Sequence, residues 1–151
     1  MYLYELCLDE AYNPKLEKVK QLKGKEQLLS TAEMVEFCNQ NFNMENLMQE
    51  HVYLIGCNSH QIITGVFLMN KGMMDKSSVG LKEVLTALLL TGSSRFMLVH
   101  NHPNNNGAVS DADMRITSQL MYLAALLEIE FVEHAIVTRD GFTSMKEEGK
   151  M

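Results

Sequence analysis

Two histidines, a serine and an aspartate near the middle of the sequence have the types and spacing to bind a metal ion. His100 and His102 are separated by one residue, and Ser110 and Asp113 follow after a polar loop. Two imidazoles and one carboxylate leave one position open on a tetrahedral zinc ion, and an open position is typical of catalytic rather than structural zinc. These residues therefore predict a catalytic metal site with His100, His102 and Asp113 as ligands.

A strand is the element that has to position the two histidines. Residues 95–99 are mostly apolar and predict a buried strand that leads into His100. Side chains two apart on a strand point to the same face, so His100 and His102 can reach one ion if the strand continues through Asn101. Pro103 then ends the strand, because proline cannot donate to a sheet.

A helix has to position the aspartate, and here an ordinary explanation competes with the metal site. Ser110 opens a helical pattern, and Asp113 falls in its first turn, where it could be only the partner of an N-cap serine. A single histidine at a strand end is often just a hydrogen-bonded polar residue. The combined spacing HxHPx(6)SxxD favours the metal site over these separate explanations.

The remaining pattern predicts a mixed α/β (α+β) domain, in which helices pack on a largely antiparallel central sheet. Besides the strand before His100, strands are expected at 2–8, 51–57, 61–69, 131–137 and 142–145. Helices are expected from 31, over a turn or two within 44–49, and at 79–90 and 111–128. The lysine-rich stretch 15–25 is expected to be a solvated loop. Residues 1–151 are expected to form one domain, with 1–44 as an N-terminal extension.

The composition describes a globular protein and disfavours several functional classes. The 151 residues are 46% hydrophobic and 21% charged, enough to bury a core. The net charge of −6 disfavours a free-standing nucleic-acid binder. Three widely spaced cysteines without a CxxC pair argue against a disulfide framework or cysteine-bound zinc, and favour a cytoplasmic setting. No signal peptide or membrane span is expected.

The motif also carries a family resemblance. The spacing of His100, His102, Ser110 and Asp113 resembles that of the JAB/MPN (JAMM) metalloenzymes, and His100–Pro103 matches the bacterial RadC type letter for letter. Other stretches resemble motifs of the same type: Lys82–Val84, His134–Val137 and Gly141–Ser144 with Glu147 or Glu148. The resemblance covers about residues 45–149 and implies a JAB/MPN architecture like that of the cytidine deaminases.

The sequence departs from the RadC pattern in the loop after the second histidine. The family usually has Pro-Ser-Gly there and a proline before the serine, where this chain has Pro103-Asn104-Asn105 and Val109. The ligand spacing is kept, so the departure bears on loop conformation and substrate choice more than on metal binding. No counterpart of the helix-hairpin-helix region of longer family members is visible.

The resemblance implies residue roles and an activity. It implies a glutamate general base at the start of an upstream strand, and Glu50 is preferred for this role over Glu83. It implies that Ser110 donates to the oxyanion, and His134 is either an orienting partner of a ligand or a plain strand histidine. The implied function is a zinc-dependent metallopeptidase with one Zn²⁺ per chain, which hydrolyses a peptide or isopeptide bond.

The partners expected from the sequence are few. A peptide or protein is the expected substrate, no membrane is involved, and the oligomeric state is left open, a homodimer included. The alternative is a RadC-type module associated with DNA repair or with protein interactions, without hydrolytic activity. The net charge gives this alternative no support. A two-metal phosphoesterase would need more ligands than the sequence offers.

Overall fold

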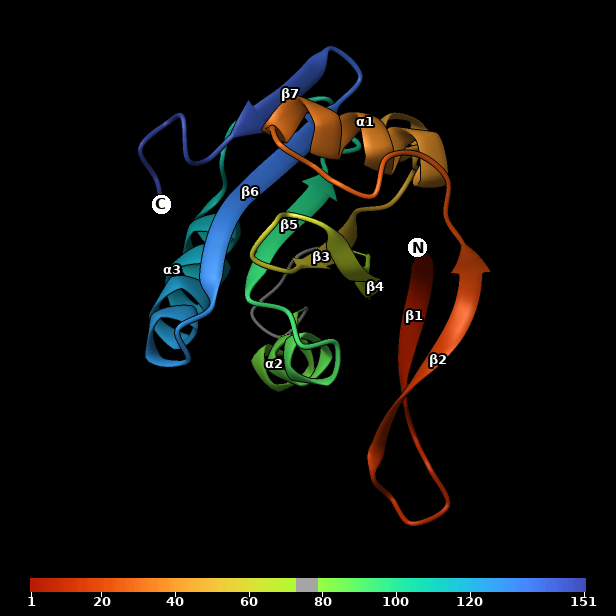
Figure 1. The fold of residues 1–151 in the computed structure, drawn as a ribbon. Coiled ribbons are helices and arrows are strands. Elements are labelled where there is room, and N and C mark those ends of the chain that lie inside the picture. Colours follow the sequence, from red (N-terminus) through yellow and green to blue (C-terminus); the bar gives the residue numbers. More distant parts are fainter. Residues whose placement is uncertain (73–78) are drawn as a thin grey trace.

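A seven-stranded mixed sheet forms the centre of this computed structural model, with helices on both of its faces (Figure 1). The structure describes residues 1–72 and 79–151. Across the sheet the strands are β2 (Pro14–Gln21), β1 (Tyr2–Leu8), β4 (Ile63–Lys71), β3 (His51–Cys57), β5 (Arg95–Asn101), β6 (Glu130–Thr138) and β7 (Gly141–Ser144). The pairs β1–β4 and β5–β6 are parallel, and the other neighbours are antiparallel. The predicted mixed α/β fold with a largely antiparallel sheet is confirmed.

The helices divide the apolar residues into two cores, one on each face of the sheet. Helix α1 (Thr31–Phe42) covers one face, and α2 (Leu81–Leu90) and α3 (Asp111–Leu126) cover the other. A short 3-10 helix, Met44–Asn46, joins α1 to β3 and is part of the helical stretch expected within 44–49. Because both faces are covered, the central strands β3 and β5 are buried almost throughout.

Local signals explain where the helices begin and end. The hydroxyl of Ser30 accepts a hydrogen bond from the N–H of Glu33 at the start of α1, and Asn43 ends that helix in a left-handed conformation, φ 53°. Gly92, with φ 61°, follows α2. Among the described residues, no helix has both the length and the apolar character that a membrane span requires.

Strand β5 lies in the middle of the sheet and directs the histidines to one face. It pairs with β3 on one side and β6 on the other. Phe96 and Leu98 belong to the core under α2 and α3, whereas Met97 and Val99 belong to the core under α1. The same alternation turns His100 toward α3.

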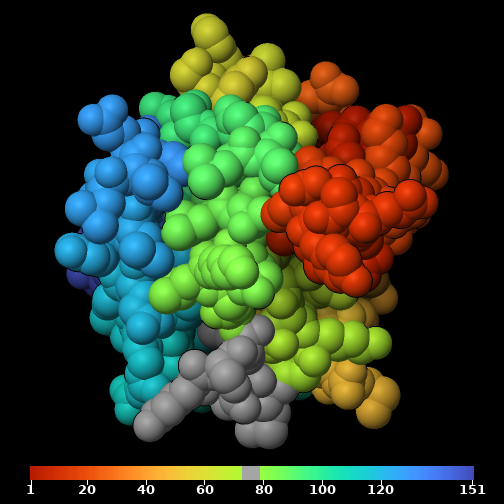
Figure 2. Space-filling view, turned by 90° about the horizontal axis from the view of Figure 1, so that it is seen from below, coloured from red at the N-terminus to blue at the C-terminus, as the bar shows by residue number. Residues whose placement is uncertain are grey.

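The lysine-rich stretch 15–25 differs from its prediction, because most of it is strand β2 at the edge of the sheet. β2 pairs with β1 along its length, and this pairing outweighs a local sequence with little alternation. Lysines are typical of edge strands, where they discourage pairing with other chains. Lys18 lies over the ring of Tyr2, and Lys25 pairs with Glu33. Figure 2 shows the β1–β2 hairpin (red) beside α2 (green).

Candidate metal centre

His100, His102 and Asp113 meet where β5 ends and α3 begins. The Nε2 atoms of the two histidines are 3.0 Å apart. Asp113 Oδ1 lies 3.1 Å from Nε2 of His100, and Asp113 Oδ2 lies 3.6 Å from Nε2 of His102. His100 and Asp113 are fully buried, while the side chain of His102 is 10% exposed. One nitrogen from each histidine and one carboxylate oxygen are close enough to hold a single metal ion.

The two oxygens of Asp113 have different surroundings. Oδ2 accepts hydrogen bonds from the backbone N–H of Ser110 at 2.8 Å and from its hydroxyl at 2.7 Å. The N–H of Asp113 donates in return to the Ser110 hydroxyl, which completes a capping box at the start of α3. Oδ1 is buried but accepts no hydrogen bond from the residues that the structure describes. A buried carboxylate oxygen without a donor is costly, and a cation at this point would satisfy it.

A buried chain of hydrogen bonds orients His100. Its Nδ1 lies 2.9 Å from Nε2 of His134, and Nδ1 of His134 lies 2.7 Å from the hydroxyl of Thr117. That hydroxyl also donates to the backbone carbonyl of Asp113, so it accepts from His134. The protons are then assigned to Nδ1 of both histidines, which leaves Nε2 of His100 with a free electron pair toward Asp113. A second nitrogen bonded in this way is typical of metal-binding histidines.

The loop backbone orients His102 by a different route. Its Nδ1 lies 2.6 Å from the carbonyl oxygen of Asn106, which only an N–H can satisfy. Nε2 of His102 is therefore also left as an acceptor. Asn105 braces this loop, because its side chain donates to Asp140 and accepts from the N–H of Arg139 in the β6–β7 turn. Asn104 accepts the N–H of Asn106, so both asparagines that depart from the RadC pattern help to order the loop around His102.

The charges of the group favour a bound cation. Two Nε2 electron pairs and a carboxylate oxygen repel one another at these distances unless a proton or a metal ion lies between them. The nearby carboxylate of Asp113 raises the pKa of His102, despite the burial of that ring. Burial alone would raise the pKa of Asp113, but its contacts with His100, His102 and Ser110 hold that pKa well below its usual range. Burial lowers the pKa of His134 and so favours its neutral form.

The structure separates the two glutamates proposed for the general base. Glu50 directly precedes β3, and two residues further on Val52 lies in the core under α2 and α3 and pairs with His100. Glu50 therefore faces the same side of the sheet as the histidines, and its negative charge contributes to the raised pKa of His102. Glu83 is exposed in the first turn of α2 and lines a pocket against β1 and β4.

Ser110 lies beside the metal-binding group, but its hydroxyl hydrogen is already used. The resemblance implies that this hydrogen is donated to an oxyanion, whereas in the structure it is donated to Oδ2 of Asp113. The backbone N–H of Ser110 holds the same oxygen. The carboxylate would therefore keep a donor if the hydroxyl turned toward a substrate.

Some residues around the site were not singled out from the sequence. Thr117 follows Asp113 by one helical turn, a spacing that could have placed it on the same face of α3. Asn106 acts through its backbone carbonyl, which no side-chain pattern reveals. Asn101 was considered only as the residue between the histidines, yet its buried side chain holds the backbone beside Glu50.

This arrangement agrees with a comparison of the whole sequence with known families. The sequence model of the RadC-like JAB domain matches residues 28–150. The chain belongs to the RadC-like JAB domain family. The predicted resemblance is confirmed, and the match begins upstream of residue 45, before α1. Strands β1 and β2 precede the matched residues.

Curated relatives of this RadC-like JAB domain are longer proteins. The chain is 29% identical over 126 residues to a UPF0758 protein of Thermotoga maritima, covering 83% of this chain and 55% of that protein. It is 31% identical over 112 residues to a UPF0758 protein of Clostridium acetobutylicum, covering 72% of this chain and 49% of that protein. The chain thus spans about half the length of the curated relatives it matches.

Proposed function

We propose that this RadC-like JAB domain is a zinc-dependent hydrolase that cleaves an amide bond, in a peptide or an isopeptide. The observation that carries the proposal is the convergence of two oriented Nε2 atoms and the donor-free Oδ1 of Asp113. Two nitrogens and one carboxylate oxygen suit Zn²⁺ and leave it a position for water. When bound, zinc would lower the pKa of such a water to about 7.

Glu50 would accept the proton of the attacking water and pass it to the leaving amine. Its place on the metal side of β3 and its effect on the pKa of His102 support this role. Ser110 would turn its hydroxyl from Asp113 to the carbonyl oxygen of the substrate, where one donor contributes roughly 3 kcal/mol. A pocket lined by Glu50, Gly72 and Pro103, together with Met48, Gln49 and Asn104, gives the substrate room beside these groups.

Metal content and hydrolysis test the two halves of this proposal. Wild-type protein loaded with Zn²⁺ is incubated with two internally quenched peptide libraries, one linked through α-amides and one through lysine ε-amides. Glu50→Gln should keep one equivalent of zinc and lose hydrolysis by about 10²–10⁴-fold, the usual contribution of a general base. His102→Ala should lose the zinc and the hydrolysis together.

Glu83→Gln is the matched control, because it makes the same change on the exposed part of α2. It should keep both zinc and hydrolysis. If it loses hydrolysis while Glu50→Gln does not, Glu50 is not the base. If the zinc-loaded wild type cleaves neither library, the proposed amide hydrolysis is rejected.

A further inference from the structure

The residue between the two histidines continues the sheet with its side chain. The backbone ladder between β3 and β5 ends at the pair Val52–His100. Beyond it, Oδ1 of Asn101 accepts the N–H of His51 at 2.8 Å, and Nδ2 of Asn101 donates to the carbonyl of Gln49 at 3.1 Å. Asn101 is 1% exposed, so these bonds are shielded from water.

These hydrogen bonds hold the residues on both sides of Glu50, Gln49 and His51. The carbonyl of Glu50 itself accepts the N–H of Gly72 at 2.8 Å, just after β4. The three consecutive residues 49–51 are thereby tied to β5 and to the residue after β4, at the point where β3 begins with His51. The backbone that carries Glu50 is thus fixed next to the strand that carries His100.

We propose that Asn101 is the positioning residue that holds Glu50 at the metal-binding group. His100 and His102 point to one face of β5, and Asn101 points to the other. From there it sets the position of the neighbouring chain, while the histidines bind the metal. Its importance for catalysis rests on the proposed role of Glu50 as the base; the positioning itself does not.

The chemistry of the contact requires an amide. The N–H of His51 needs an acceptor, and the carbonyl of Gln49 needs a donor. Among side chains of this size, only asparagine offers both in one plane. Leucine at position 101 would have a similar volume and neither bond, and aspartate would keep the acceptor and lose the donor. Asn101→Leu therefore removes both hydrogen bonds, and Asn101→Asp removes one of them.

The test uses the full chain loaded with Co²⁺ and labelled with ¹³C-glutamate, so that paramagnetic shifts report distance from the metal. The carboxyl signal of Glu50 is assigned by its absence in Glu50→Gln. Asn101→Leu should keep one equivalent of Co²⁺, lose at least half of the paramagnetic shift of Glu50, and exchange the N–H of His51 at least tenfold faster. In Asn101→Asp, the paramagnetic shift of Glu50 and the exchange rate of the His51 N–H should lie between those of Asn101→Leu and wild type. If the leucine variant does not fold, the aspartate variant alone provides the test.

Asn41→Leu is the matched control. Asn41 holds Lys23 in the same way, accepting its N–H at 2.9 Å and donating to its carbonyl at 2.9 Å. It lies on α1, away from the histidines, so its loss should leave Glu50 and the metal as in wild type. A shift of the Glu50 signal in this variant would show that general loosening, and not Asn101, moves Glu50.

Two other outcomes would overturn the inference: an unchanged Glu50 signal in both Asn101 variants, or loss of the metal in them. The first means that Glu50 is positioned without Asn101, and the second that Asn101 supports the ligands instead. Hydrolysis of the peptide libraries is measured in parallel and should fall at least tenfold in Asn101→Leu. If wild type and Glu50→Gln are equally inactive while the Glu50 signal still shifts in the Asn101 variants, the proposed function fails and the positioning role of Asn101 stands.

Discussion

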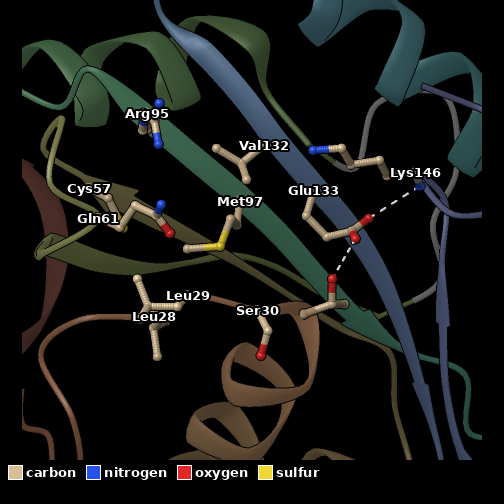
Figure 3. A pocket seen from close by; sticks show the side chains of 11 residues that line it. Leu28, Leu29, Ser30, Cys57, Gln61, Arg95, Met97, Val132, Glu133 and Lys146 are labelled. Atoms are coloured by element: carbon tan, nitrogen blue, oxygen red, sulfur yellow. Dashed lines mark hydrogen bonds between the residues drawn. The ribbon is translucent and has the colours of Figure 1, made fainter.

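Asp113 and Glu133 are both buried carboxylates, one on each face of the sheet, and their surroundings are opposite. Glu133 accepts from the hydroxyls of Thr31 and Ser144 at 2.7 and 2.6 Å, and from the backbone N–H groups of His134 and Lys146 at 2.9 and 3.4 Å. Figure 3 shows Glu133 in the wall of a small pocket, hydrogen-bonded to Lys146. Within the described part of the chain, Asp113 has hydrogen-bond donors on Oδ2 alone.

The difference shows that burial by itself does not identify a functional carboxylate. Each oxygen of Glu133 already has two donors, so it ties α1, β6 and the chain after β7 together and has little to offer a ligand. Asp113 keeps one oxygen without a donor and turns it toward His100, beside which His102 also lies. An unsatisfied acceptor beside other potential ligands separates the metal site from a structural contact.

Removing the donor-free oxygen should have the largest effect. Asp113→Asn replaces the anionic ligand, and Zn²⁺ affinity should fall by at least 100-fold, more than the 10–100-fold lost with an orienting group. Competition with a chromophoric chelator measures the affinity. If this variant binds zinc as wild type does, the donor-free oxygen of Asp113 does not mark the metal site, and the contrast with Glu133 fails.

Glu133→Leu should have the opposite effect, a loss of stability without a loss of zinc. Four donors lose their acceptor inside the protein, so the free energy of unfolding should fall by about 3 kcal/mol or more in urea titrations. Zinc stoichiometry should stay at one, because the four donors lie outside the group of His100, His102 and Asp113. Loss of zinc at unchanged stability would reverse the roles assigned to the two faces.

His134→Phe should weaken zinc binding by about 10–100-fold, as expected for a group that orients a ligand. The phenyl ring fills the space but offers no acceptor to Nδ1 of His100. His134→Gln places an oxygen near the former Nε2 and should recover part of the affinity. If both variants bind zinc equally, the hydrogen bond to His100 does not orient it.

The pH dependence should differ between metal-free and metal-loaded protein. The contact with Asp113 raises the pKa of His102 above its ordinary 6.5, so in EDTA its stabilising contribution is fully present below about pH 6.5 and is lost as the pH rises through the raised pKa. Zinc needs the unprotonated ring, so its affinity should fall about tenfold per pH unit below that pKa. Urea midpoints and zinc titrations across pH measure both trends, and Asp113→Asn should remove the first.

The sequence predicted the parts of the site that depend on local pattern. Alternation along a strand placed His100 and His102 on one face, and the Ser110 pattern marked the first turn of α3. Both interpretations of Asp113 prove compatible, because one oxygen completes the capping box and the other faces His100. The structure brings the three together as the spacing predicted.

Contacts between distant segments could not be predicted in this way. Glu133 looks like an ordinary polar strand residue, and its donors come from parts of the chain up to 102 residues away. The bond from His134 to His100 spans 34 residues, and β2 forms only because β1 supplies its partner. Glu50 was singled out by the family resemblance alone.

The described residues that could together bind the metal lie within 100–113, at the end of one strand and the start of one helix. A segment this short can capture an ion with two histidines before the sheet has formed. Zinc would then also bind the unfolded ensemble, and by mass action it would stabilise the native protein less than its affinity for the folded site implies. Glu50 lies just before β3, so it would come near the metal only once the sheet has formed.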